Sequence, residues 1–116
     1  MGLAVFFVYE QHIHMLELDA MSGFEWDAGN ARKNADIHSV SQSEAEAVFF
    51  HQPLLVLPDP RHSEQQPRFH ALGQTQDGRR LHITFTLRAQ GSLIRIISAR
   101  DMHRKERNLY DQQSEE

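Results

Sequence analysis

The stretch "RLHITFTLR", residues 80–88, decides the fold class of this 116-residue chain. Apolar and polar side chains alternate strictly along it, which predicts a strand that buries one face and leaves the other polar. The apolar positions are Leu81, Ile83, Phe85 and Leu87, and the polar positions are His82, Thr84, Thr86 and Arg88. A sheet with one polar face carrying histidine and arginine is therefore expected.

Neighbouring strands can be read outward from this stretch. Downstream, "AQGS" predicts a turn into a strand "LIRIISAR", residues 93–100. Upstream, an Asp77-Gly78 hairpin turn follows "RFHALG", residues 68–73, and "PLLVLPDP", residues 53–60, is an apolar strand closed by prolines. Short turns between consecutive strands predict an antiparallel sheet. "FEWD", residues 24–27, reads as a further short strand.

Three helices are expected around this sheet. Asp27 can cap a helix over residues 28–38, Ser41 and Glu44 form a capping box before a second, and Asp101 can cap a last one. The predicted fold is α+β: an antiparallel sheet of about four strands, packed on one face by the N-terminal helices and a C-terminal helix.

One domain fits the length of the chain. We place it at residues 21–111, followed by an acidic tail at 112–116. Residues 1–20 form an N-terminal extension without Lys or Arg. It is either non-native, with Met15 or Met21 as the natural start, or an extra edge strand "LAVFFVY".

Composition excludes several classes of function. The chain has no cysteine, so it has no disulfide, no thiolate nucleophile and no Cys-ligated zinc. No apolar run is long enough to span a bilayer, and "GLAVFFVY" lacks the basic flank and cleavage site of a signal peptide. We expect a cytoplasmic protein with no membrane partner.

Charge is distributed unevenly. Residues 1–60 hold nine acids and two bases, whereas residues 61–110 hold ten bases, nine of them Arg, and four acids. Arginine suits bidentate contact with phosphate. The basic half raises the chance of a polyanionic partner, although an ordinary solvated surface explains the charge equally well.

Two arginines interrupt the apolar strand 93–100. Arg95 and Arg100, with Ser98 between them, are either strand-end residues paired to carboxylates or a cationic site for an anion. An ideal strand would put Arg95 and Arg100 on opposite faces, because their separation is odd.

The residue types suit cleavage of RNA without a metal. Such a reaction needs a base for the 2′-hydroxyl, an acid for the leaving oxygen, and cations for the phosphorane. A metal-dependent hydrolase is a weaker alternative, because His12 with His14, or Asp59 with His62, lack obvious further ligands. We expect no metal and no cofactor.

Four stretches, in order over roughly residues 24–110, make the chain resemble the BrnT family of bacterial toxins. They are "FEWD" followed by Asn34 and His38; the helix into Pro53-Leu54; "PDPRHSEQQPRFHALG"; and "RIISAR" followed by Glu106, Arg107 and Tyr110. The resemblance implies a fold like that of RelE ribonucleases and an RNA-cleaving activity that arrests translation and growth.

The resemblance also implies partners and site residues. The partner would be an antitoxin with a ribbon-helix-helix domain, forming a heterotetramer that reaches operator DNA only through the antitoxin. The residues expected to act in catalysis are His62, Arg68, Arg95, Ser98 and Arg100. Those expected to bind RNA are His38, His70, His82 and Arg107.

The chain departs from the family pattern near the first helix. The family commonly has Lys at position 30, where this chain has Asn30, and Lys-His-Gly where it has Ile37-His38-Ser39. Loss of two cations weakens phosphate binding. An attenuated toxin that keeps antitoxin binding and co-repression is therefore the alternative function.

Overall fold

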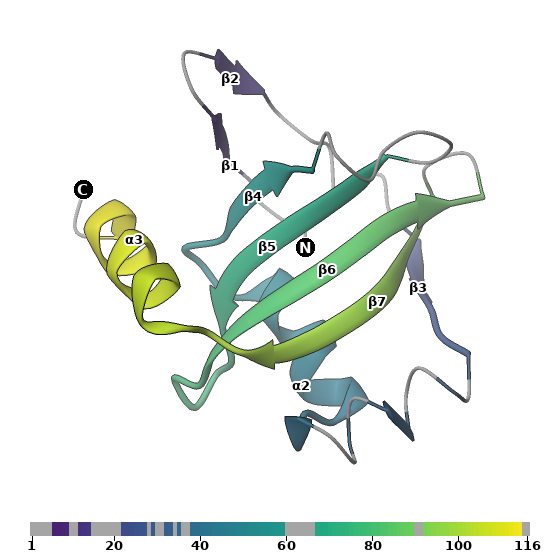
Figure 1. The fold of residues 1–116 in the computed structure, drawn as a ribbon. Coiled ribbons are helices and arrows are strands. Elements are labelled where there is room, and N and C mark those ends of the chain that lie inside the picture. Colours follow the sequence, from purple (N-terminus) through teal and green to yellow (C-terminus); the bar gives the residue numbers. More distant parts are fainter. Residues whose placement is uncertain are drawn as a thin grey trace.

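The computed structural model describes residues 6–9, 12–14, 22–27, 29, 32–33, 35, 38–59, 67–89 and 92–114. These residues build an α+β fold around a mixed sheet of seven strands in the order β2-β1-β4-β5-β6-β7-β3 (Figure 1). The strands are β1 Phe6–Tyr9, β2 His12–His14, β3 Gly23–Glu25, β4 Leu55–Pro58, β5 Arg68–Gln74, β6 Arg80–Arg88 and β7 Leu93–Asp101.

The centre of the sheet is the expected antiparallel run β4-β5-β6-β7. The prediction of about four strands, all antiparallel, was wrong at the flanks. There β1 pairs with β4 and β3 pairs with β7, both in parallel. Parallel neighbours are joined by long connections rather than tight turns, so no turn signal in the sequence marks these pairs.

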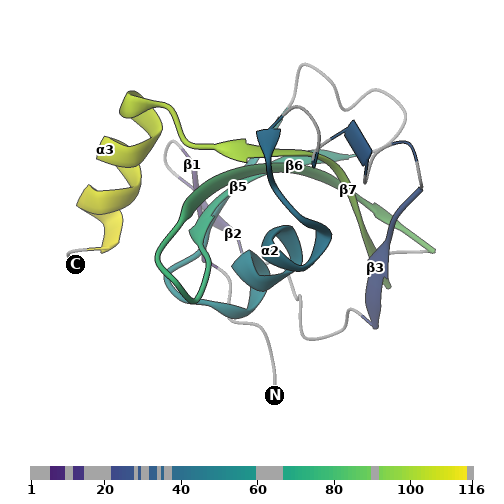
Figure 2. The same ribbon diagram turned by 90° about the horizontal axis from the view of Figure 1, so that it is seen from below.

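Helices lie on both sides of the sheet rather than on one. The sheet curves around α2 (Gln42–Ala47) and the 3₁₀ turn η2 (Val48–Phe50), while α3 (Arg104–Ser114) lies on the other side (Figure 2). Below α3 a small second cluster joins Leu55, Leu72, Met102 and Tyr110. The Tyr110 hydroxyl donates to the Pro53 carbonyl at 2.6 Å. The prediction that all helices cover one face of the sheet was wrong. Leu55 and Leu72 make the opposite face apolar at this end, and α3 covers them.

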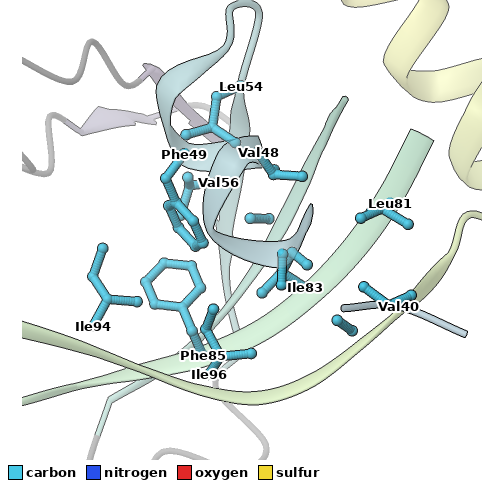
Figure 3. Packing of buried hydrophobic residues seen from close by; sticks show 13 residues of the cluster. Val40, Val48, Phe49, Leu54, Val56, Leu81, Ile83, Phe85, Ile94 and Ile96 are labelled. Carbon is cyan, nitrogen blue, oxygen red and sulfur yellow. The ribbon is translucent and has the colours of Figure 1, made fainter. Parts of the chain in front are cut away.

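The main core fills the space between the sheet and α2–η2. It is built by the alternating apolar positions of β6 and their neighbours on β4, β5 and β7 (Figure 3). Phe49 packs edge-on against Phe85 with ring centroids 5.1 Å apart. A Cβ at Gly73 would stand 2.6 Å from Val48 Cγ1, so the glycine lets η2 approach the strand closely. The predicted burial of the apolar face of β6 is confirmed, but the polar face is buried as well, at His82, Thr84 and Thr86.

Two local predictions about turns and caps are confirmed. Ser41 Oγ accepts from the Glu44 amide at 3.1 Å, and the Glu44 carboxylate accepts from the Ser41 amide at 3.0 Å. Gly78, at φ 87°, closes the hairpin between β5 and β6. The helix expected over residues 28–38 falls largely outside the described residues.

The predicted Asp101 cap was wrong. Asp101 is the last residue of β7, opposite Leu81, and its carboxylate accepts two hydrogen bonds from Arg79. The carboxylate at the start of α3 is instead that of Glu106, which accepts from the His103 amide at 2.8 Å.

A β-bulge interrupts the pairing of β6 with β7. Thr84 lies opposite Ser98, but the next residue, Phe85, lies opposite Ile96, so Ile97 is the extra residue. The bulge reverses the alternation of side chains along β7. The expectation that Arg95 and Arg100 face opposite sides was therefore wrong.

Candidate functional site

The face of the sheet turned away from α2 carries three rows of aligned residues. The first row is Arg68, Thr86, Arg95 and Glu25; the second is Leu57, His70, Thr84 and Ser98; the third is Leu55, Leu72, His82 and Arg100. Successive rows are two residues apart along β5 and β6, or about 6.6 Å. The middle row, with its histidine and two hydroxyls, is flanked by arginines on both sides.

His70 is held at both ring nitrogens. Its Nε2 lies 2.8 Å from Asp59 Oδ2 at the end of β4, and its Nδ1 lies 3.2 Å from Thr84 Oγ1 on β6. The side chain of His70 is 31% exposed and that of Asp59 11%. With Asp59 ionised, Nε2–H donates to the carboxylate, and Nδ1 is left as the basic nitrogen. This is the arrangement of an oriented proton acceptor.

His82 is a second imidazole in contact with the first. Its ring centroid is 4.9 Å from that of His70, and the residue is 9% exposed. Burial, together with the nearby Arg100 cation, lowers the pKa of His82 to about 4. Its buried Nδ1 has no hydrogen-bond partner among the described residues. His82 is therefore a neutral, enclosed neighbour of His70 at physiological pH.

Arg100 is held by a carboxylate from α3. Both oxygens of Glu106 accept from its guanidinium, at 2.8 and 2.9 Å. Burial alone would raise the pKa of Glu106, but the hydrogen bonds from Arg100 and the His103 amide lower it to about 2. The same carboxylate lies 3.9 Å from His82 Nε2. Glu106 therefore joins α3 to the third row.

The sequence alone did not indicate this role for Glu106. Its side chain is 23% exposed. The spacing of His103 and Glu106 at the start of a helix is the one signal that could have indicated an inward-turned carboxylate.

Arg95 is held by two carboxylates from the β3 edge. Its NH1 donates to Glu25 Oε1 at 2.8 Å and its NH2 to Asp27 Oδ2 at 2.6 Å. The hydrogen bond to Glu25, and then that to Asp27, raises the pKa of Arg95. Both arginines of β7 thus stand in ion pairs, as the first of the two sequence interpretations had it.

The remaining predicted residues divide between the site and other places. Arg68 and Ser98 lie in the rows beside His70. Arg107 lies on α3, outside the rows, and donates to the Met102 carbonyl at 2.9 Å. His38 also lies outside them, and its carbonyl accepts from Arg79 at 3.2 Å. His62, Asn30 and Ile37 lie outside the described residues.

Two further properties of the described residues bear on the class of protein. Within the described ranges, no group of three or more His, Asp or Glu side chains gathers as a metal site. No helix in that part of the chain has the length and apolar character to cross a membrane.

Comparison with known proteins identifies the family. The model of the ribonuclease toxin BrnT, of type II toxin–antitoxin systems, matches residues 26–106. The match spans α2, the central strands β4–β7 and the start of α3 as far as Glu106. No curated protein matches the chain. The three rows lie almost wholly within the matched region, and the chain belongs to the BrnT family of ribonuclease toxins.

Proposed function

We propose that this chain cleaves RNA without a metal, with His70 as the general base between two rows of arginine. The observation that supports the proposal is the position of His70. Asp59 accepts a hydrogen bond from its ring, and Arg95 and Arg100 lie in the rows on either side of it. A phosphodiester over the middle row would reach both arginines. The hydroxyl of Ser98, in the same row, is a further donor.

The reaction follows from this placement. His70 Nδ1 takes the proton of a ribose 2′-hydroxyl, and the 2′ oxygen bonds to the adjacent phosphorus. The bond from phosphorus to the 5′ oxygen breaks, and that oxygen leaves with a proton taken from solvent. The products are a 2′,3′-cyclic phosphate and a 5′-hydroxyl. The arginines stabilise the charge on the phosphorane, and Asp59 stabilises the imidazolium.

The cellular role proposed here is arrest of translation and growth through RNA cleavage. A ribbon-helix-helix antitoxin neutralises the toxin in a heterotetramer, which represses the operon through the DNA-binding domain of the antitoxin. The family match supports a protein antitoxin as the partner. Growth after induced expression, with and without the neighbouring antitoxin gene, tests this role.

Cleavage of single-stranded RNA by the purified chain, in the presence of a chelator, tests the chemistry. His70→Gln should lower the rate at least about a hundredfold, since a general base contributes that much or more. His103→Gln is the matched control, because that side chain is exposed at the start of α3. Retained cleavage in His70→Gln, or loss of cleavage with the chelator, contradicts the proposal.

A second candidate is an attenuated toxin that acts as a co-repressor with its antitoxin. The observation that favours it is that carboxylates already neutralise Arg95 and Arg100. Restoring cations with Asn30→Lys and Ile37→Lys separates the two functions. If the parent chain forms a complex with the antitoxin without arresting growth, the co-repressor role is supported. If the double variant also gains no activity, the missing lysines are not the cause of the attenuation.

A further inference from the structure

The far end of the β6–β7 pair holds Arg88, an arginine that the proposed site does not include. Arg88, the last residue of β6, lies diagonally across from Arg95 on the same face. Its Nε is 3.6 Å from Glu25 Oε1, the oxygen that also accepts from Arg95 at 2.8 Å. Two guanidinium groups from neighbouring strands thus converge on one oxygen atom.

The Glu25 carboxylate lies where the two guanidinium groups can bind another oxyanion. Guanidinium groups bind carboxylate and phosphate oxygens with the same planar geometry, and an RNA phosphodiester carries the same single negative charge as a carboxylate. We propose that Arg88 and Arg95 form a phosphate-binding subsite for single-stranded RNA, and that Glu25 occupies this subsite in the free protein. The proposal rests on the function proposed above and extends its substrate path.

The position of the subsite gives the direction of that path. Thr84, Thr86 and Arg88 succeed one another on the same face of β6. Arg88 therefore lies two rows from His70, about 13 Å along the strand. An RNA strand that places its reacting phosphate over the middle row would bring a flanking phosphate to Arg88 and Arg95.

Exchange of the carboxylate for phosphate is feasible because the ion pairs are partly exposed. The side chains of Arg88, Arg95, Glu25 and Asp27 are 40%, 26%, 32% and 47% exposed. Exposed ion pairs contribute little to stability and are screened by salt. Glu25 can turn into solvent when phosphate arrives, while Asp27 continues to hold Arg95.

The charge balance makes Glu25 a competitor of RNA. Two arginines and two carboxylates leave this group neutral, so the group attracts phosphate weakly while Glu25 stays in place. Removing the charge of Glu25 should therefore strengthen RNA binding, whereas removing that of Arg88 should weaken it.

Binding of a short single-stranded 2′-O-methyl RNA to the full chain tests the subsite. This RNA lacks the free 2′-hydroxyl, so it is bound without being cleaved. Arg88→Gln should weaken binding about three- to tenfold at low salt and reduce the slope of log K against log salt by about 0.7. Glu25→Gln should strengthen binding about two- to fivefold. Arg104→Gln, an exposed arginine on α3, is the matched control.

The outcomes separate this inference from the proposed function. If the parent chain binds no RNA, the proposed function fails. If it binds RNA, but Arg88→Gln behaves as Arg104→Gln does, or Glu25→Gln does not strengthen binding, the subsite is refuted while the proposed function stands. Thermal unfolding of each variant establishes that it is folded before binding is compared.

Discussion

Arg95 and Arg100 project from the same face of the sheet although they are five positions apart on β7. Ile97, the extra residue of the β-bulge, makes this possible by reversing the alternation between them. Without that reversal the two arginines could not flank the row of His70, Thr84 and Ser98. The bulge is therefore the local feature on which the whole candidate site depends.

Deletion of Ile97 should be tolerated, which is unusual for an inner strand. The deletion leaves Ser98 opposite Thr84 and Ile96 opposite Phe85, so every side chain keeps its face. We expect a folded protein with a loss of about 1–2 kcal/mol from the altered twist and lost apolar contact. Thermal unfolding measures this loss.

A matched deletion of Ile83 in β6 provides the control. At that position both neighbouring ladders are regular, so the deletion turns half of the strand inside out. That variant should not fold. If the two deletions lower the unfolding free energy equally, Ile97 is not a dispensable extra residue.

Replacement of Ser39 by glycine should stabilise the protein. Ser39 has a φ of 55°, a left-handed conformation that costs a residue with a Cβ about 1 kcal/mol relative to glycine. Ser39→Gly should raise the melting temperature by about 4–8 °C. Ser43→Gly, in the exposed first turn of α2, should lower it instead, because glycine there has poor helix propensity. A fall in both variants would contradict the assignment.

Arg79 should be far more important to stability than its neighbour Arg80. The guanidinium of Arg79 donates to the Asp101 and Glu44 carboxylates and to the His38 and Ser39 carbonyls. The hydrogen bonds to Asp101, and then that to Glu44, raise the pKa of Arg79. Lysine cannot supply this planar fork.

Arg79→Lys should therefore cost about 2 kcal/mol of unfolding free energy. Arg80→Lys should cost less than about 0.5 kcal/mol, because the ion pair that Arg80 makes with Asp111 is exposed. Denaturant unfolding of both variants measures the difference. Similar losses would mean that the Arg79 network contributes little beyond a surface ion pair.

Stability should fall between pH 6.5 and 4 because of His82. Its pKa is about 4 in the folded protein and 6.5 when exposed. Within this window the unfolded chain binds the extra proton, so unfolding becomes easier as the pH falls. When His82 is fully protonated in the unfolded chain and still neutral in the folded protein, the unfolding free energy is lower by up to about 3 kcal/mol.

His82→Gln should flatten the pH profile in this window. A second decline in stability, below pH 4.5, is expected from Glu106. Its pKa is about 2 in the folded protein, so as the pH falls the carboxyl is protonated in the unfolded chain before it is protonated in the folded one. Unfolding free energies measured from pH 3 to 8 test both parts. An unchanged slope in His82→Gln would assign the decline to another group.

The sequence by itself determined the features that depend on near neighbours. Alternation along residues 80–88 predicted the strand and its buried face, and Ser41 with Glu44 predicted the start of α2. The Asp77-Gly78 pair predicted the hairpin. In each case the signal and the structure lie within a few residues, so local backbone chemistry is sufficient.

Only the tertiary structure decided the features that depend on distant pairing. The parallel strands β1 and β3, the bulge at Ile97 and the carboxylate partners of Arg95 join segments far apart in the chain. The sequence named Arg95, Ser98 and Arg100, but their common face follows from how β7 pairs with β6. The neighbouring strand determines which face of the sheet a side chain takes after a bulge. The periodicity of the local sequence therefore does not predict it.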